Sequence, residues 1–265
     1  MYLLVPAAGM GRRMGSDRNK LLLTLRSQPL IYWTILAAQS SRQISWIGII
    51  SQPTDWTDLK EILAGLMTKP IQLIEGGATR QESVYNGLQA LPPEAKQVLI
   101  HDGARCLATA DLLDRCAEAI RGARETPSTN HHLPTTKTQL TPGLIAAVPV
   151  KDTIKVVDMG LIQSTLERRH LWAAQTPQAF DVQMLKQCHE EGRRQGWSVT
   201  DDAALFEKCG LPVQIVEGEE TNLKLTTPVD LAIAEFILQQ RLGVRGEGEM
   251  GRCINYLFPS PFSPS

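Results

Sequence analysis

The sequence predicts an α/β fold: a mostly parallel sheet with helices on both faces. In the first half of the chain, short apolar runs alternate four times with longer helical patterns, which is typical of successive βα units. The apolar runs are nearly uniform rather than alternating with polar residues. Strands have such uniformly apolar sequences when helices cover both faces of a parallel sheet.

The four units can be placed by composition and by their helix starts. Either Thr54 or Asp55 can cap the second helix, since both side chains accept hydrogen bonds from a free first turn. We expect the strands at 2–5, 46–51, 71–75 and 97–102. We expect the helices at 29–40, 54–66, 79–91 and 110–125.

The alternation stops after the fourth helix. Residues 126–143 are rich in Thr and Pro and predict a flexible loop, and 161–172 shows no clear period. Pro228 suits the first turn of a final helix. Further strands are expected at 144–150, 153–157, 213–218 and 222–226, and further helices at 181–196, 200–210 and 228–242.

Length and composition limit the organisation and the class of protein. The 265 residues suit one domain, placed at 1–242, and the Gly-, Pro- and Ser-rich 243–265 is expected to be a disordered tail. A formal net charge of -1 argues against a globally basic nucleic-acid binder. Any binding of phosphate must therefore come from local clusters.

The cysteines and the apolar runs indicate the compartment. The five cysteines are scattered and contain no C-x-x-C, which fits neither a zinc site nor a disulfide framework and suits a reducing environment. The chain shows no cleavable signal and no apolar run long enough to span a bilayer. We therefore expect a cytoplasmic protein without a membrane partner.

Three unusual segments follow predicted strand ends: "PAAGMGRRM" (6–14), "GGATRQES" (76–83) and "HDGAR" (101–105). Ligands of open α/β sheets bind beyond the carboxyl ends of the strands. If the strands are parallel, the three segments lie along one rim and form one site.

The first segment predicts an anion site. It is not a dinucleotide fingerprint, because Met14 stands where the third glycine belongs, and it lacks the Gly-Lys pair of a P-loop. Small residues expose backbone N–H groups, and Arg12, Arg13 and Lys20 add fixed cations. We favour a phosphate cradle over the alternative of a solvated basic cluster.

The third segment supplies an acid. Asp102 at an apolar strand end is costly to leave unpaired, and beside a triphosphate a carboxylate commonly holds or orients Mg²⁺. Gly103 lets the backbone approach, and Arg105 offers a fork for an oxyanion. The alternative is a structural pair between Asp102 and Arg105. His101 points the other way by strand periodicity, and we expect a buried core histidine.

With these residues assembled, the chain resembles the 2-C-methyl-D-erythritol 4-phosphate cytidylyltransferases of the non-mevalonate isoprenoid pathway. Eight family motifs occur in order over about residues 2–242. They match Pro6–Met14 with Lys20, Gly76–Ser83, His101–Arg105, Pro149–Lys155, Thr176–Phe180, Thr200–Asp202, Asn222–Thr226 and Pro228–Ala234. The loop at 126–143 is longer than is usual in the family, and the tail at 243–265 lies outside the family pattern.

The resemblance implies a Rossmann-like fold, a reaction and its cofactor. The family transfers the cytidylyl group of CTP to a sugar-alcohol phosphate, releases pyrophosphate and uses Mg²⁺ or another divalent cation. It also implies a homodimer, in which a projecting β-arm, about 144–175 here, reaches across to the partner subunit.

The resemblance also assigns roles to residues. The catalytic cations would be Arg13, Lys20 and Lys224. Asp102 would hold the metal. CTP would be bound by Pro6, Ala7, Ala8, Gly9, Gly11, Gly77, Arg80, Ser83, Asp102 and Gly103. Methylerythritol phosphate would be bound by Arg105, Thr153, Arg168, Thr176 and Thr200, with Lys224 also contacting a reacting phosphate.

Several alternatives stay open at this point. Ribitol-5-phosphate cytidylyltransferases share the CTP half and differ in the acceptor. A sugar nucleotidyltransferase or glycosyltransferase would usually carry a D-x-D motif after a strand, which is absent here. A non-catalytic nucleotide-binding regulator would be expected to lose Arg13, Lys20 or Lys224, and all three are present. From sequence alone, a plain salt bridge between Arg168 and a nearby acid, such as Glu167, is favoured over a phosphate clamp.

Overall fold

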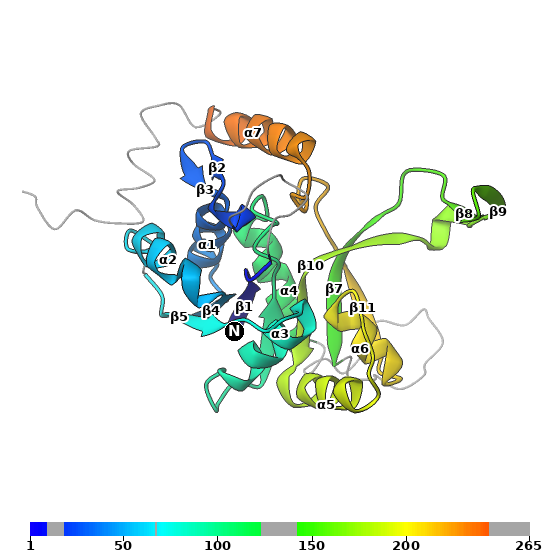
Figure 1. The fold of residues 1–265 in the computed structure, drawn as a ribbon, viewed down its shortest axis with the longest axis horizontal. Helices are drawn as coiled ribbons and strands as arrows, with labels where there is room; N and C mark the ends of the chain where they lie inside the picture. Colours follow the sequence, from blue (N-terminus) through cyan, green and yellow to red (C-terminus); the bar gives the residue numbers. More distant parts are fainter. Residues whose placement is uncertain (10–18, 67, 123–141, 244–265) are drawn as a thin grey trace, which may run out of the picture.

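The computed structural model describes residues 1–9, 19–66, 68–122 and 142–243. Its centre is a seven-stranded sheet with the order β11-β7-β10-β6-β1-β4-β5 (Figure 1). The bounds of its strands, in chain order, are β1 Tyr2–Pro6, β4 Trp46–Ser51, β5 Ile71–Glu75, β6 Gln97–Ile100, β7 Gly143–Pro149, β10 Trp172–Asp181 and β11 Val213–Glu217.

The prediction of a mostly parallel sheet is confirmed. Of the described strands in this sheet, β10 alone runs against its neighbours: it pairs antiparallel with both β6 and β7, and every other pair is parallel. The physical reason is the connection. β7 and β10 are joined through a hairpin with no crossover helix between them, and a return without a crossover gives antiparallel strands.

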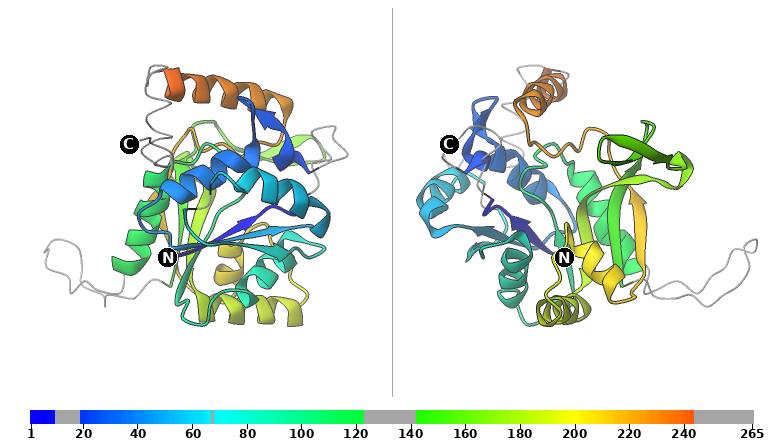
Figure 2. Two further views of the ribbon diagram at one scale, coloured as in Figure 1. Left: turned by 90° about the vertical axis from the view of Figure 1, so that its left-hand side faces the viewer. Right: turned by 45° about the vertical axis from the view of Figure 1, so that its right-hand side comes forward.

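Helices cover both faces of the sheet (Figure 2). They are α1 Leu30–Ser40, α2 Trp56–Leu63, α3 Arg80–Gln89, α4 Ala110–Gly122, α5 Val182–Arg194, α6 Asp202–Lys208 and α7 Pro228–Gly243. Short 3₁₀ turns lie at Lys20–Leu22 (η2), Pro53–Asp55 (η3) and Arg168–His170 (η4), and a small hairpin joins β2 Thr24–Leu25 to β3 Gln28–Pro29.

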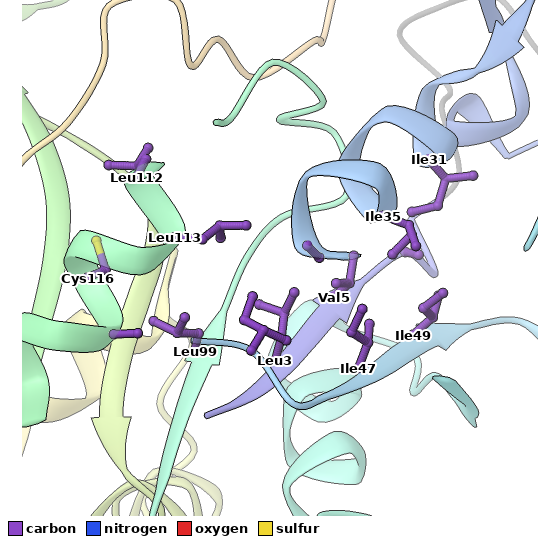
Figure 3. Close-up of a cluster of buried hydrophobic side chains, with 14 of the residues drawn as sticks. Leu3, Val5, Ile31, Ile35, Ile47, Ile49, Leu99, Leu112, Leu113 and Cys116 are labelled. Carbon is purple, nitrogen blue, oxygen red and sulfur yellow. The ribbon is translucent and has the colours of Figure 1, made fainter. Parts of the chain in front are cut away.

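The core forms two layers because strand side chains alternate. Leu3 and Val5 of β1 point to the face covered by α1, α2 and α4, where they pack with Ile31 and Ile35 (Figure 3). Leu4, between them, belongs to a second cluster on the α3, α5 and α6 face. Both faces of β1 are therefore apolar and buried, which explains its uniform sequence.

The predicted strand at 222–226 is wrong. The segment runs between β11 and α7 without joining a sheet. Leu225 is fully buried and Leu223 partly buried, in a third cluster with Leu25 and Leu30. Alternating leucines require one buried face. Here helices and a small hairpin provide that face, not a sheet.

Residues 155–165 form a projecting hairpin, here called the arm. Its strands are β8 Lys155–Asp158, which begins two residues later than expected, and β9 Leu161–Thr165, which lies where no period was visible. Met159 and Gly160 have positive φ, as a tight hairpin turn requires. All nine strand residues are exposed, including Leu161 at 69% and Ile162 at 64%. A strand without a buried face leaves no hydrophobic pattern to detect. The arm stands away from the body (Figures 1 and 2).

Several expectations fall outside the described residues. They are the flexible loop predicted at 126–143, apart from its last two residues, the end of the fourth helix beyond Gly122, and the tail beyond Gly243. Within the described ranges, no helix combines the length and the apolar character needed to cross a membrane.

Candidate active site

A cavity of about 600 Å³ opens at the carboxyl end of the parallel strands, where the sequence placed the site. It lies beyond β1 and receives residues from the turns after β4, β5 and β6, from η2 and from the segment before α7. The predicted residues that line it are Pro6, Ala7, Ala8, Gly9, Lys20, Gly77, Arg80, Ser83, Asp102 and Lys224. Gly11 and Arg13 lie outside the described residues.

Close backbone packing shapes the base of the cavity. The N–H of Ala7 donates to the carbonyl of Ile50 at 2.7 Å, and that of Gly103 to the carbonyl of Pro6 at 3.2 Å. A Cβ on Gly76 would lie 2.5 Å from the Cβ of Ala8, so only glycine permits this approach. Gly103 supports the base from behind rather than lining it.

The start of α3 forms one wall. The N-cap Thr79 accepts from the N–H of Glu82 at 3.1 Å. The hydroxyl of Ser83 donates to the carbonyl of Thr79 at 2.8 Å and accepts from the N–H of Gly77 at 3.0 Å. Ser83 therefore holds the turn that carries Gly77, and its own hydroxyl is already engaged.

Asp102 lies at the centre of the charged groups. Its Oδ1 is 3.3 Å from Nε of Arg80, and its Oδ2 is 2.7 Å from Nζ of Lys224. Burial alone would raise the pKa of Asp102, but the two cations outweigh it and hold the pKa well below its usual range. The carboxylate is therefore ionised at physiological pH. The predicted alternative, a pair with Arg105, is not the contact formed.

Lys20 lines the same cavity. Its Nζ donates to the carbonyl of Leu225 at 2.9 Å, which ties η2 to the segment that also carries Lys224. Two lysines distant in sequence thus line one cavity with Arg80 and Asp102. A site of this kind, with several cations around one carboxylate, suits a polyanionic ligand that brings a metal.

Arg80 is shared with a second acid that sequence reasoning did not select. Its Nη1 is 2.9 Å from Oδ2 of Asp202, the first residue of α6. Asp202 is buried, and burial would raise its pKa, but the charge of Arg80 and contact with His189 lower it overall. The sequence motif at 200–202 includes Asp202, but the predicted role, binding of the acceptor, was assigned to Thr200. Thr200 is exposed and does not line the cavity.

His101 is a buried core histidine, as expected. Its Nε2 lies 3.2 Å from the carbonyl of Arg105, which can only accept, so Nε2 carries the proton. Nδ1 then accepts from the hydroxyl of Thr176 at 3.1 Å, and that hydroxyl oxygen accepts from the N–H of Asp102 at 3.0 Å. Burial lowers the pKa of His101 to about 4. The neutral ring thus fixes Thr176 beneath Asp102.

None of the five residues predicted to bind the acceptor, Thr200 included, lines the cavity. Thr176 is buried under Asp102, and Thr153 and Arg168 are exposed at the base of the arm. The guanidinium of Arg105 donates to the carbonyls of Asn222 at 2.7 Å and Ala174 at 3.2 Å. Arg168 donates to the carbonyl of Lys151, while Glu167 pairs with Arg169 at 2.8 Å. The predicted Arg168–Glu167 pair is therefore not formed.

Comparison with known proteins places this chain in a family. The family model described as 2-C-methyl-D-erythritol 4-phosphate cytidylyltransferase matches residues 1–126 and 121–240. Relatives with that name are similar to the chain: one from Nostoc sp. is 70% identical over 91% of this chain and 99% of its own length. Another from Synechocystis sp. is 60% identical over 91% and 98%.

Solved structures show the same fold. A 4-diphosphocytidyl-2C-methyl-D-erythritol synthase from Anaerococcus prevotii is 29% identical, with a TM-score of 0.75 and coverage of 90% of this chain and 95% of its own. The 2-C-methyl-D-erythritol 4-phosphate cytidylyltransferase from Thermus thermophilus is 30% identical, with a TM-score of 0.66 over 89% and 97%. The chain belongs to the 2-C-methyl-D-erythritol 4-phosphate cytidylyltransferase family.

Proposed function

We propose that this protein transfers the cytidylyl group of CTP to 2-C-methyl-D-erythritol 4-phosphate and releases pyrophosphate, a step of isoprenoid precursor biosynthesis. The observation that carries the proposal is the ionised Asp102 between Arg80 and Lys224, at the edge of a turn made of small residues. Family membership favours this acceptor over ribitol 5-phosphate. It also argues against a non-catalytic regulator.

The reaction requires no general base. A phosphomonoester loses its second proton with a pKa of about 6, so the acceptor phosphate is already a nucleophile near neutral pH. One of its oxygens attacks the α-phosphorus of CTP, and the bond from that phosphorus to the β-phosphate oxygen breaks. The barrier is mutual repulsion of anions, which in-line positioning and fixed cations lower.

The residues divide this work by position. Lys20 and Lys224 stabilise charge on the reacting phosphates from two sides of the cavity, and Arg13 is assigned to the same task from the segment beyond Gly9. The small residues Ala7, Ala8 and Gly77 leave room for the cytosine and offer backbone groups to its edge. Arg80 and Ser83 support this half of the site.

The residues at the site fit a Mg²⁺ ion. Within the described ranges no three His, Cys, Asp or Glu side chains gather as a metal site. Mg²⁺ commonly binds through one or two carboxylates plus substrate phosphates, so the single carboxylate of Asp102 is sufficient. An ionised carboxylate has about four lone-pair sites, and Arg80 and Lys224 occupy only part of them. When bound, the cation would neutralise phosphate charge.

We further propose a homodimer in which the arm completes the partner's site. Two observations support it. The arm exposes apolar side chains, including Val157, Met159 and Ile162, and apolar clusters of this kind mark protein interfaces. Thr153 and Arg168 lie at its base, away from the cavity of their own chain. The cytoplasm is the proposed location, since the four described cysteines are free thiols.

Purified protein incubated with CTP and Mg²⁺ is expected to release pyrophosphate with methylerythritol phosphate and not with ribitol 5-phosphate. Chelation of the metal should abolish the release, and added Mg²⁺ should restore it. The measurement is coupled pyrophosphate detection, with the cytidine product identified by mass spectrometry. Release with ribitol 5-phosphate alone would overturn the proposed acceptor. Release that survives chelation would overturn the role of the metal.

Complementation between inactive variants tests the arm. Lys20→Met and Arg168→Ala are each expected to lose at least nine-tenths of the activity, in the range typical for lost transition-state contacts. Co-expressed, they should regain about a quarter of the wild-type activity, because half of the dimers are mixed and carry one intact site. The control is co-expression of Lys20→Met with Lys224→Met, because both lysines line the cavity of their own chain and no mixed dimer then carries an intact site. Equal activity in the two mixtures would contradict arm exchange.

A further inference from the structure

The guanidinium of Arg80 is held by two carboxylates at once. Nε lies 3.3 Å from Asp102, and Nη1 lies 2.9 Å from Asp202. Asp102 lines the cavity, whereas Asp202 does not. The third nitrogen, Nη2, is buried and has no hydrogen-bond partner among the residues that the structure describes. The side chain of Arg80 is 27% exposed and lines the cavity. Its guanidinium is therefore held at the cavity wall by one acid inside the cavity and one outside it.

Asp202 is itself firmly placed. Its side chain is 1% exposed, and its other oxygen, Oδ1, lies 3.3 Å from Nε2 of the buried His189 on α5. The start of α6 is anchored to β10, where Gln178 donates to Asp201 at 2.7 Å and accepts from the N–H of Ala203 at 3.3 Å. Asp202 therefore reaches Arg80 from a rigid part of the fold.

We propose that Asp202 is a positioning residue for CTP, acting through Arg80. This inference rests on the proposed function, in which Arg80 belongs to the CTP half of the site. An arginine beside a single carboxylate can rotate about that contact. Two carboxylates bound to different nitrogens fix the plane of the guanidinium. Asp202 thus fixes the orientation in which the side chain of Arg80 lines the cavity.

The contact between Arg80 and Asp202 also limits how closely Arg80 pairs with Asp102. A guanidinium paired with Asp102 alone would move towards that carboxylate and compete more strongly with a metal or with Lys224. With Asp202 present, Asp102 keeps a contact of 3.3 Å to Arg80 and a closer one of 2.7 Å to Lys224. Loss of Asp202 should therefore impair CTP binding more than acceptor binding, because Arg105 and Arg168, which are assigned to the acceptor alone, are bonded to other groups than Arg80 and Asp202.

The test is Asp202→Asn, which keeps the shape and removes the charge. We expect kcat/KM for CTP to fall at least tenfold, a size that small misplacements near a reacting group produce. The KM for methylerythritol phosphate should stay within about twofold, since a contact to Arg80 carries no acceptor binding. The matched control is Asp181→Asn, a capping acid of another helix, which caps α5 through the N–H groups of Gln183 and Met184. Asparagine also caps well, so the control should keep its CTP kinetics.

A double-mutant cycle excludes a merely structural effect. In an Arg80→Met background, Asp202→Asn should cause no further loss in kcat/KM for CTP. In that background, Asp202→Asn should also raise the melting temperature, because the buried carboxylate of Asp202 has lost its partner Arg80 and the substitution removes its charge. The positioning role is overturned if Arg80→Met lowers kcat/KM for CTP and Asp202→Asn does not. It is also overturned if the losses in kcat/KM from the two substitutions simply add. If Arg80→Met leaves CTP kinetics unchanged, the assignment of Arg80 to CTP fails, and the inference fails with it.

Discussion

Asp102→Asn is expected to lower kcat/KM for CTP about a thousandfold, at the upper end of losses seen when a preorganised charge is removed. The carboxylate lies between Arg80 and Lys224 and keeps both in place. An amide cannot neutralise them, and the two cations then face one another in a half-buried site. The variant also loses the oxygen proposed to hold Mg²⁺.

Steady-state kinetics over a range of Mg²⁺ concentrations separate these effects. If Asp102 holds the metal, the Mg²⁺ concentration for half-maximal activity should rise in the variant. Asp114→Asn is the matched control, because Asp114 accepts from the N–H groups of Arg42 and Gln43 far from the cavity. A loss of less than about tenfold in Asp102→Asn, with an unchanged Mg²⁺ dependence, would contradict the proposed site.

Phe180→Ala is expected to lower the free energy of unfolding by about 3–5 kcal/mol, the usual range for removing a buried aromatic ring. Phe180 is fully buried on β10, and its ring centroid lies 4.7 Å from that of Phe206 on α6. A Cβ on Gly143 of the neighbouring β7 would lie 3.0 Å from both rings. Gly143 leaves room for the two rings. Because it has no side chain, it cannot fill the cavity that Phe180→Ala would leave.

Urea denaturation followed by circular dichroism gives the measurement. The control is Phe236→Ala on α7, whose side chain is 61% exposed. It should change stability by less than about 0.5 kcal/mol, as exposed sites usually do. Equal effects at the two positions would mean that burial in the structure does not describe the packing of Phe180.

The first half of the fold could be predicted because its strands and helices are locally complete. "WIGIIS" and "IQLIE" are apolar along their whole length, and both strands begin and end where expected. The direction of β10 could not be predicted, since it depends on the hairpin that joins it to β7. The leucines at 223 and 225 alternate as in a strand, and only the tertiary contact with α7 and β2 shows why they do not form one.

The candidate site could be predicted where a residue's role follows from its strand end. Asp102 and Gly77 belong to that group, and both line the cavity. Asp202 was missed because it starts a helix on the far side of Arg80, about 120 residues away along the chain. A buried acid at a helix start reads as a capping residue. Only the fold reveals that its partner is an arginine of the cavity.

β10 passes through three environments in ten residues. It is exposed from Trp172 to Ala174 at the base of the arm, buried and polar at Gln175–Gln178, and buried and apolar at Phe180. An extended strand rises about 3.3 Å per residue, so Trp172 and Thr176 are separated by about 13 Å at most. The span from the base of the arm to the residue beneath Asp102 is thus set by the covalent length of a single strand. An insertion or deletion between those two positions would change both the reach of the arm and the position of Thr176 beneath Asp102, whereas one in the turn between Asp158 and Leu161 would change the arm alone.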